Sequence, residues 1–516
     1  MNIGAMPATV LFISHEVQLE WYGWIAAELR RRHGVRTVLW TLGERDRQTA
    51  LRSQTFDEVV DLLAGFDRFS PDILRQQERN LEALLAFEHR VGTTCFHEDA
   101  ILDRGITGFT DAEVDFHTIH CRWTPQQIAA LAIHLLGAME ARLAAAPVLF
   151  AVGEYNSLPY RLAHRLLRSC EIPHLCPIVV PHAGEHVYFA DALDWEWPQC
   201  RDLYREFLEG GIPAHLRPIA EQLLDSVARK VKPTYFVRSR RGPRGWTQRL
   251  HPQRVWRGLR DWRWARSFQS RSNPRSLPPE LLSPRGRAAR AFDVRRRKQN
   301  YERVAQHAVP AQPYASYFLH EQPEYTVEGL AFEYQDQVAF VRNLVACLPA
   351  DMLLAVKEHR PQAGRRPLSF YGELVSIPNV VLLHDTLDSQ DVIARARLAV
   401  TLTGTVAMES VCAGVPCVVF GNVHYEYFRG VYKAAGFQHL RQLLRDSGQV
   451  RGATREEALA ALAARHAASQ EAPYPPADAS DAAKFTDALE NECRRRGIAL
   501  PAQGASGRAQ EAGSPG

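Results

Sequence analysis

The stretch "RLAVTLTGTVAMESVCAGVPCVVFGN", residues 397–422, holds an apolar run that stops at a Thr-Gly-Thr turn and resumes beyond it. "LAVTLT" predicts a buried strand, "TVAMESVCAG" a helix and "PCVVFGN" a second strand. Strand, turn, helix and strand in this order form the unit of a parallel α/β sheet. In such sheets ligands bind beyond the carboxyl ends of the strands, where the next helix offers unpaired N–H groups to an anion.

The turn itself has the residues of a phosphate site. Gly404 lets the backbone approach a phosphate closely, and Thr403 and Thr405 each add a hydroxyl donor. The alternative is that Thr405 only caps the helix, which needs no ligand. Glu409 favours a ligand, because a capping-box acid would stand one residue earlier. It lies one turn deeper on the helix face of Thr405, where it could accept both hydroxyls of a ribose.

The same alternation of strands and helices extends outward from this stretch. Upstream of it, "YASYFLHEQPE", "DMLLAVKEHRP" and "NVVLLHDT" predict strands, with the helix "YQDQVAFVRNLVACLP" between the first two. Near the N-terminus, residues 9–14 and "VRTVLWTLG" predict strands around a helix at about 19–32, and "PVLFAVGEYN", "SLPYRLAHRLLRSC" and "HLCPIVVP" repeat the pattern. We therefore predict an α/β fold of two Rossmann-like bodies with parallel sheets.

Length and composition agree with two bodies. A chain of 516 residues is too long for one hydrophobic core. It is 46% hydrophobic and 23% charged, and it has no uninterrupted apolar run of membrane-spanning length. The start "MNIGAMPATVLFISHE" lacks the features of a secretory signal, so we expect a cytoplasmic protein. The nine cysteines are scattered and never form C-x-x-C, which predicts reduced thiols and no zinc site.

One basic segment divides the chain. Residues 229–303 contain 23 Lys and Arg against four Asp and Glu. We place the two bodies at 1–228 and 304–480, joined by this basic linker, with a C-terminal helix at 481–516 that ends in a tail of disordered composition from about residue 497. Within the linker, arginines alternate with Trp246, Trp256, Trp262 and Trp264. That mixture suits an anionic membrane surface, nucleic acid, or a partner-docking or solvated loop.

Four segments resemble the capsule polysaccharide biosynthesis family in order and spacing. They are "YFLHEQPEYT", "LLAVKEHRPQ", "FYGELVSIPNVVLLHD" and "AVTLTGTVAMESVCAGVPCVVFGN". The resemblance covers roughly residues 314–430 well and 153–191 more loosely. Characterised members of that family include Kdo transferases, which build the lipid-attached linker of bacterial capsules.

The resemblance implies a GT-B glycosyltransferase: two Rossmann-like domains, the C-terminal one holding a nucleotide sugar, the N-terminal one facing the acceptor, and neither metal nor cofactor. The nucleotide-sugar residues that it implies here are His320, Gln322, Glu324, Lys357, His359, Thr403, Gly404, Thr405 and Glu409. The chain departs from the family where Arg360 separates His359 from Pro361, which puts the aim of His359 in question. Arg360 could compensate by facing a phosphate.

Two of these elements also have simpler interpretations. His320 could be a satisfied histidine at a strand end, although its polar neighbours in "HEQPE" support a site. Lys357 and His359 alternate along a strand and are expected on one face, which suits a diphosphate or a sugar carboxylate.

A GT-B enzyme needs a carboxylate or acid–base group beside the anomeric carbon. Glu154, at the carboxyl end of a predicted strand, is the first candidate. His15 and Glu16 after the first strand are the second, and Asp191 with His182 and Glu185 the third. Each could equally be a loop residue without chemistry.

These observations predict a cytoplasmic glycosyltransferase, peripheral at the inner face of the cytoplasmic membrane. It would move a sugar, with CMP-linked Kdo the leading donor, onto a capsular or other surface polysaccharide or its lipid anchor. The expected partners are the nucleotide sugar, a lipid-linked or polysaccharide acceptor, an anionic membrane surface contacted by residues 238–298, and other capsule-assembly proteins. A nucleotide-sugar epimerase of similar fold is the alternative enzyme. An Arg-rich nucleic-acid-binding protein is the alternative of another class, disfavoured because it leaves the Thr-Gly-Thr turn unexplained.

Overall fold

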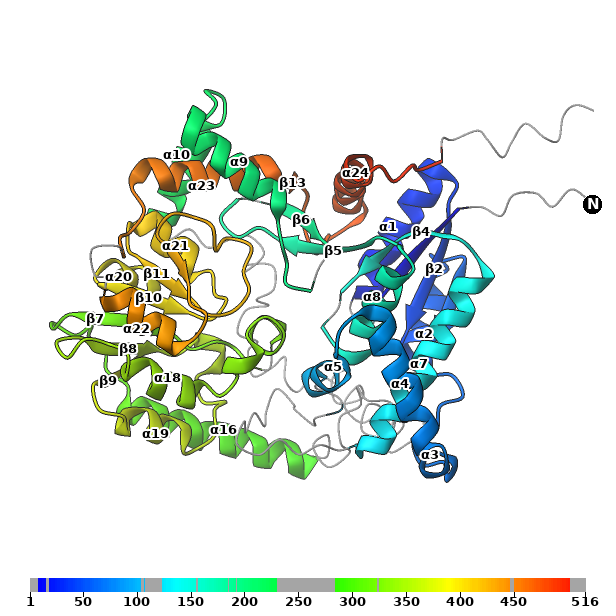
Figure 1. Cartoon of the computed structure of the whole chain (residues 1–516), viewed down its shortest axis with the longest axis horizontal. Coiled ribbons are helices and arrows are strands. Elements are labelled where there is room, and N and C mark those ends of the chain that lie inside the picture. Colours follow the sequence, from blue (N-terminus) through cyan, green and yellow to red (C-terminus); the bar gives the residue numbers. More distant parts are fainter. Residues whose placement is uncertain are drawn as a thin grey trace, which may run out of the picture.

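A computed structural model of the chain describes residues 8–14, 18–103, 106, 123–154, 156–183, 185–191, 193–229, 284–322, 324–445 and 450–501. Two α/β bodies lie side by side, one coloured blue to cyan and the other green to orange in Figure 1. Each is built around its own sheet. This arrangement confirms the predicted fold class of two Rossmann-like bodies.

The sheet of the N-terminal body has the order β13-β6-β5-β4-β1-β2-β3. Its strands are β1 (Thr9–Ile13), β2 (Arg36–Thr41), β3 (Glu58–Asp61), β4 (Val148–Gly153), β5 (His174–Val179), β6 (His186–Ala190) and β13 (Gln470–Glu471). The pairs from β3 to β5 are parallel, as predicted. The edge is different, because β6 runs antiparallel to β5 and β13 antiparallel to β6.

The sheet of the C-terminal body has the order β12-β11-β10-β7-β8-β9, and every pair is parallel. Its strands are β7 (Tyr314–Phe318), β8 (Leu353–Lys357), β9 (Val380–Leu383), β10 (Leu398–Thr401), β11 (Cys417–Val419) and β12 (Val431–Lys433). Read from the other edge, the order corresponds to 3-2-1-4-5-6, which is the doubly wound arrangement. Chain direction across the sheet reverses between β7 and β10, so this switch point is the place where a ligand is expected.

Helices cover both sheets. In the N-terminal half they are α1 (Gln18–His33), α2 (Glu44–Ser53), α3 (Asp72–Arg75), α4 (Gln77–Val91), α5 (Phe96–Leu102), α7 (Pro125–Ala145), α8 (Leu158–Ser169), α9 (Pro198–Gly210) and α10 (Arg217–Ala228). Helix α7 is, among the described residues, the one helix long and apolar enough to span a membrane. It packs against α4 and α8 and buries seven side chains in the N-terminal core, as a core helix does.

The C-terminal half contributes α16 (Pro284–Val304), α17 (Tyr325–Glu328), η1 (Phe332–Tyr334), α18 (Gln337–Val345), η2 (Arg360–Gln362), α19 (Phe370–Ser376), α20 (Ser389–Ala394), α21 (Val406–Ala413), α22 (Phe437–Arg445), α23 (Arg455–Ala468) and α24 (Ala479–Arg495). Short helices follow β7, β8, β9 and β10 in turn. Each such connection returns the chain to the start of the next parallel strand.

The two halves of the chain exchange helices. Helices α9 and α10 pack on α23 and α21, at the top left of Figure 1. In return, α24 packs on α1, and β13 extends the N-terminal sheet. Each body therefore contains residues from both sides of the proposed boundary at residue 228. Helices α9 and α10 precede it but pack with the C-terminal body, and β13 and α24 follow it but pack with the N-terminal body.

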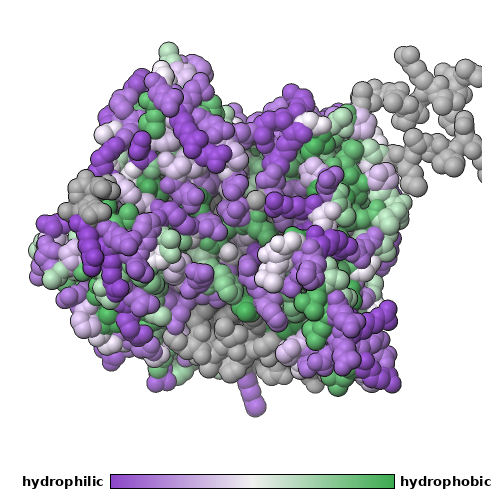
Figure 2. All heavy atoms as spheres, in the orientation of Figure 1, coloured by the Kyte–Doolittle hydropathy of each residue, from purple (hydrophilic) through white to green (hydrophobic). Residues whose placement is uncertain are grey.

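An apolar cluster joins the two bodies. It contains Val180 and Tyr188 of the β5–β6 hairpin together with Met408 of α21 and Leu459 of α23. Hydrophilic residues predominate on the visible face of the C-terminal body in Figure 2. The side chains of the cluster are buried. Burial of these apolar side chains favours the association of the two bodies.

Three further predictions can be compared with the structure. The eight cysteines among the described residues form no disulfide with one another. Most of the basic linker, including its four tryptophans, lies outside the described residues. The tail was expected to begin at about residue 497, but Ile498 and Leu500 pack against the N-terminal core, and residues 502–516 lie outside the described residues.

Candidate functional site

A cavity of about 640 Å³ lies between the two bodies at the carboxyl ends of their central strands. Its C-terminal wall is formed by residues that follow β7 and β10, the neighbouring strands of the switch point. Its N-terminal wall includes Glu154, which follows β4 next to β1. The volume falls in the range of small-molecule and cofactor sites. Both sheets therefore direct their ligand-binding ends into one space.

His320, two residues after β7, is held in one tautomer. Its Nε2 accepts a hydrogen bond from the backbone N–H of Leu402 at 3.1 Å and lies 3.1 Å from Oγ1 of Thr401. Because Nε2 accepts, the ring proton is on Nδ1. Burial is the main cause that lowers the pKa of His320 to about 3, so the ring is neutral at pH 7. It lines the cavity as a fixed, uncharged N–H donor.

The Thr-Gly-Thr turn is rigid. The N–H of Gly404 donates to Oγ1 of Thr401 at 3.0 Å, and Oγ1 of Thr403 donates to the carbonyl of Thr326 at 2.8 Å. The hydroxyl of Tyr425 donates to the carbonyls of Thr403 and Gly404, at 2.9 and 2.7 Å. A Cβ on Gly404 would lie 2.8 Å from Oγ1 of Thr401. Glycine is therefore required here by close packing beside the cavity.

Thr405 and Glu409 form a pair on helix α21. The side chain of Thr405 makes no capping hydrogen bond; its hydroxyl donates to Oε1 of Glu409 at 3.4 Å. Glu409 is 15% exposed, and its Oε1 lies 3.8 Å from Nε2 of His182 on the β5–β6 hairpin. The simple capping interpretation of Thr405 is thus excluded. Both residues line the cavity.

His359 also lines the cavity, although Arg360 separates it from Pro361. Its Nδ1 lies 3.5 Å from a carboxylate oxygen of Glu321. This contact with His359 is the first cause that lowers the pKa of Glu321. Glu321 and Glu324 belong to the same wall. Arg360 is exposed and is not among the described residues that line the cavity.

Lys357 and His359 do not share a face, contrary to the prediction. Strand β8 ends at Lys357, so the alternation of side chains stops before His359. Nζ of Lys357 is buried, 3.4 Å from the carbonyl of Asp385, and burial lowers its pKa. Lys357 does not line the cavity.

Gln322 belongs to a buried hydrogen-bond network beneath the site. It is buried and bonded to the side chains of Gln337 and Arg366 and to the carbonyl of Gln335. It does not line the cavity. Glu358, whose side chain is fully buried, binds Arg366 twice at 3.2 Å and accepts from Tyr371 at 2.7 Å. Nη2 of Arg366 donates to the carbonyl of His320 at 2.5 Å, so this network fixes the loop that carries the histidine.

Glu154 stands on the opposite wall and is oriented by several donors. Nε2 of Gln18 donates to its Oε1 at 2.5 Å, and Nδ2 of Asn156 donates to its Oε2 at 2.8 Å. The hydroxyl of Tyr474 lies 3.4 Å from Oε1. Such contacts fix the carboxylate without burying it fully. Two other candidates, His15 and Glu16, lie outside the described residues. Asp191, the third, pairs with Arg496 at 2.9 Å.

Sequence reasoning missed Arg465 of α23 and His424, which also line the cavity. Arg465 is 2% exposed. A signal was available, because in "REEALAALAARHAA" this arginine follows the apolar period of the helix and not its polar face.

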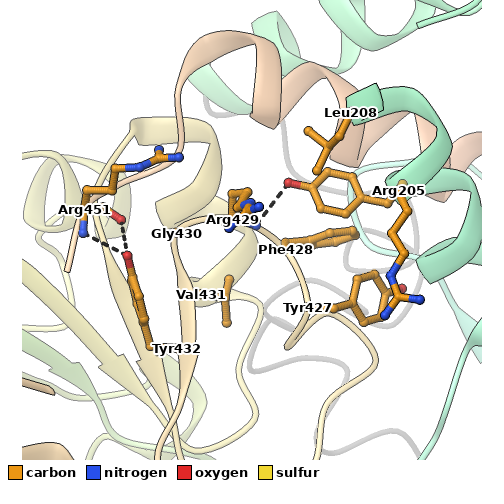
Figure 3. A pocket seen from close by; sticks show the side chains of 10 residues that line it. Arg205, Leu208, Tyr427, Phe428, Arg429, Gly430, Val431, Tyr432 and Arg451 are labelled. Carbon is orange, nitrogen blue, oxygen red and sulfur yellow. Dashed lines mark hydrogen bonds between the residues drawn. The ribbon is translucent and has the colours of Figure 1, made fainter. Parts of the chain in front are cut away.

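A second cavity, of about 370 Å³, opens beside α9. Arg205, Arg429 and Arg451 surround the rings of Tyr427, Phe428 and Tyr432 there (Figure 3). None of the predicted site residues lines it. The hydroxyl of Tyr204 accepts from the backbone N–H of Arg429 at 3.0 Å, and Arg451 is paired with Glu457. Separately, ligand atoms of Glu302, His307 and His384 lie within 4.8 Å of one another.

No family model matches the chain, and no curated protein matches it. Solved structures of similar shape include the beta Kdo 2,4 transferase KpsC of Thermosulfurimonas dismutans, at 13% identity and a TM-score of 0.32 over 61% of this chain and 79% of that one. The UDP-GlcNAc 2-epimerase of Neisseria meningitidis bound to UDP-GlcNAc has 10% identity and a TM-score of 0.27 over 88% and 97%. Anabaena Alr3699/HepE, in complex with UDP and glucose, has 10% identity and a TM-score of 0.24 over 94% and 100%. At these values the likenesses are distant and carry no argument about what this chain does.

Proposed function

We propose that this protein is a glycosyltransferase that moves a sugar from a nucleotide donor to an acceptor held by the N-terminal body. The observation that carries the proposal is that the carboxyl ends of the central strands of both sheets face each other across one cavity. The C-terminal wall offers a phosphate turn at Gly404 and a neutral N–H donor from His320, and the N-terminal wall offers the oriented carboxylate of Glu154. A transferase needs these groups on opposite sides of the sugar.

In the proposed reaction the acceptor hydroxyl forms the new bond to the anomeric carbon as the bond from that carbon to the donor phosphate breaks. Glu154 takes the hydroxyl proton, and the electron pair leaves with the phosphate oxygen. The turn at Gly404, the hydroxyl of Thr405, which leaves Glu409 to donate to the phosphate, and Nδ1–H of His320 stabilise the charge that develops on the departing phosphate. Glu409 binds the ribose hydroxyls and thereby sets the register of the donor.

The donor, acceptor and location belong to the same proposal. We take a CMP-linked acidic sugar such as Kdo as the donor and a surface polysaccharide or its lipid anchor as the acceptor. The protein would work in the cytoplasm at the inner face of the membrane, with residues 238–298 on anionic lipids. Flotation of the full chain with vesicles of phosphatidylserine and phosphatidylcholine tests the last point. Binding that persists after the four tryptophans of the linker are replaced by serine contradicts it.

Melting of the purified protein with CMP, CDP, UDP, GDP or RNA tests the nucleotide site. A ligand at a hundred times its dissociation constant adds about 2.7 kcal/mol to the free energy of unfolding. We expect one nucleotide to stabilise the wild type and Glu456→Gln, an exposed control on α23, but neither Thr405→Val nor Glu409→Gln. Stabilisation by RNA alone, equal in all variants, overturns the proposal. Conversion of the donor sugar without acceptor or nucleotide release identifies an epimerase instead.

A further inference from the structure

Arg465 is a buried cation with too few partners. Its side chain is 2% exposed and lies on the buried side of α23, whose alanines and leucines belong to the apolar cluster that joins the two bodies. Nη2 donates to the carbonyl of Pro181 at 3.0 Å, which is its one hydrogen bond within the described part of the chain. Nε is buried and has no partner there. A guanidinium has five N–H donors, so most of its capacity is unused.

Comparison with the other buried arginines isolates this feature. Arg161, 2% exposed, is paired with Glu98 and Asp99, and Arg366, fully buried, is paired with Glu358. Among the described residues no Asp or Glu oxygen lies within 4.0 Å of the guanidinium of Arg465. An ion removed from water costs several kcal/mol unless an opposite charge accompanies it. The protein itself supplies that charge to two of these arginines and not to the third.

The location of Arg465 shows where the missing charge would come from. Of the described residues that line the interdomain cavity, Arg465 is the one lysine or arginine, whereas Glu154, Glu321, Glu324 and Glu409 are acidic. A substrate anion that enters this cavity therefore meets a single permanent positive charge. The positive charge of Arg465 lies beside α23 and the β5–β6 hairpin, and these residues are distinct from those of the phosphate turn.

His424 adds a second unused group on the same wall. The hydroxyl of Tyr188 donates to the carbonyl of Trp195 at 3.0 Å, so its oxygen accepts from Nδ1 of His424 at 3.3 Å. Nε2 of His424 is then an acceptor, and it is buried without a partner among the described residues. Burial, followed by the charge of Arg465, holds the pKa of His424 well below its ordinary value. This wall thus offers a cationic donor and a neutral acceptor, which match an oxyanion and a hydroxyl.

We propose that Arg465 forms an oxyanion subsite of the interdomain cavity, which binds a carboxylate or phosphate group of the sugar substrate. The inference rests on the proposed glycosyltransferase function and assigns it an anionic substrate. Bidentate contact with two oxygens would use the free donors of the guanidinium, as arginine does with planar carboxylates and with phosphates. A neutral sugar would leave the charge buried and unpaired.

Binding of small probes to the full-length protein tests the subsite. The probes are inorganic phosphate, glucuronate and its neutral counterpart glucose, followed by calorimetry and by melting. The variants are Arg465→Met, Arg465→Lys and Arg455→Met, a control that removes an exposed arginine from the same helix. We expect glucuronate or phosphate, but not glucose, to bind the wild type and Arg455→Met. We expect at least a tenfold rise in Kd in Arg465→Met and a smaller rise in Arg465→Lys. Preference between the two probes identifies the group as carboxylate or phosphate.

The melting temperature without probes separates this role from a structural one. If the guanidinium of Arg465 is unpaired until a ligand binds, Arg465→Met should melt no lower than the wild type, because the substitution removes an unpaired buried ion. If its function is to hold Pro181, the same variant melts lower and anion binding is absent or unchanged, which overturns the inference. Thr405→Val distinguishes the two proposals. If glucuronate binding is lost only in the Arg465 variants and no nucleotide binds any form of the protein, the subsite stands and the nucleotide site is refuted. If a nucleotide binds and Thr405→Val removes that binding, while glucuronate binding does not depend on Arg465, the subsite alone is refuted.

Discussion

Replacement of Glu358 by alanine tests the support beneath the candidate site. Glu358 and Arg366 are both fully buried, and two contacts of 3.2 Å join them. Removal of the carboxylate leaves Arg366 as an uncompensated buried charge, which costs about 3–5 kcal/mol. It also leaves the hydroxyl of Tyr371 and the backbone N–H of His359 without the acceptor that they contact at 2.7 Å. We therefore expect Glu358→Ala to be strongly destabilised.

The size of the effect can be checked by melting. In a domain of 150–250 residues 1 kcal/mol corresponds to about 2–4 °C, so Glu358→Ala should melt about 6–20 °C below the wild type. The double variant Glu358→Leu/Arg366→Met buries no charge and should recover most of that loss. Glu333→Ala, which removes an exposed carboxylate of the same body, should melt within about 2 °C of the wild type.

Two results would refute this reasoning. A Glu358→Ala protein that melts within about 2 °C of the wild type would mean that the buried pair contributes little. A double variant at least as unstable as the single one would mean that packing, and not the unpaired charge, sets the loss. Because Arg366 also holds the carbonyl of His320, nucleotide binding should fall in the single variant even below its melting temperature.

Three further predictions concern the cavity. Glu154→Gln should lower kcat by about 10²–10⁴ and leave nucleotide affinity within about threefold, measured by steady-state kinetics and calorimetry. Gly404→Ala places a Cβ 2.8 Å from Oγ1 of Thr401 and should cost about 1–3 kcal/mol in urea unfolding and at least tenfold in nucleotide affinity. His320 has a folded pKa of about 3, below its unfolded value near 6.5. Its contribution to stability is therefore complete above pH 6.5 and lost as the pH falls toward 3, by about 2 kcal/mol at pH 5, and His320→Gln should remove that part of the pH dependence in urea titrations.

Each of these has a clear contrary outcome. Equal losses of nucleotide affinity and kcat in Glu154→Gln would place that carboxylate in donor binding. Unchanged affinity in Gly404→Ala would show that the turn does not contact the ligand. An unchanged pH profile in His320→Gln would show that His320 is not among the buried neutral histidines whose protonation destabilises the protein in acid.

The positions of individual strands and helices could be predicted from the sequence. Apolar runs and turn residues located β1, β4, β7, β8 and β10 to within a few residues, because strand and helix periods are properties of adjacent residues. The pairing of Thr405 with Glu409 followed from helical spacing for the same reason. These features depend on neighbours in sequence, so one sequence suffices.

The predictions that failed concern features that depend on residues far apart in the sequence. An amphipathic helix does not specify which body will cover its apolar face, so the transfer of α9 and α10 was not foreseen. The common face expected for Lys357 and His359 assumed a strand two residues longer than β8. The apolar period of α23 indicated that Arg465 is buried, but the absence of a carboxylate near it is a property of the folded interior that the sequence does not show.

The exchange of helices between the two halves has a consequence for synthesis on the ribosome. Helix α24 contributes Phe485, Leu489 and other residues to the core that also contains Val10 and Ile25. Nearly five hundred residues must therefore be translated before the first strand and helix are fully covered. Domains usually fold in order as they emerge, but here the first body waits for the end of the second. A nascent chain stalled before residue 479 should expose the apolar surface of α1. Chaperones would bind that surface until α24 has been translated and covers it.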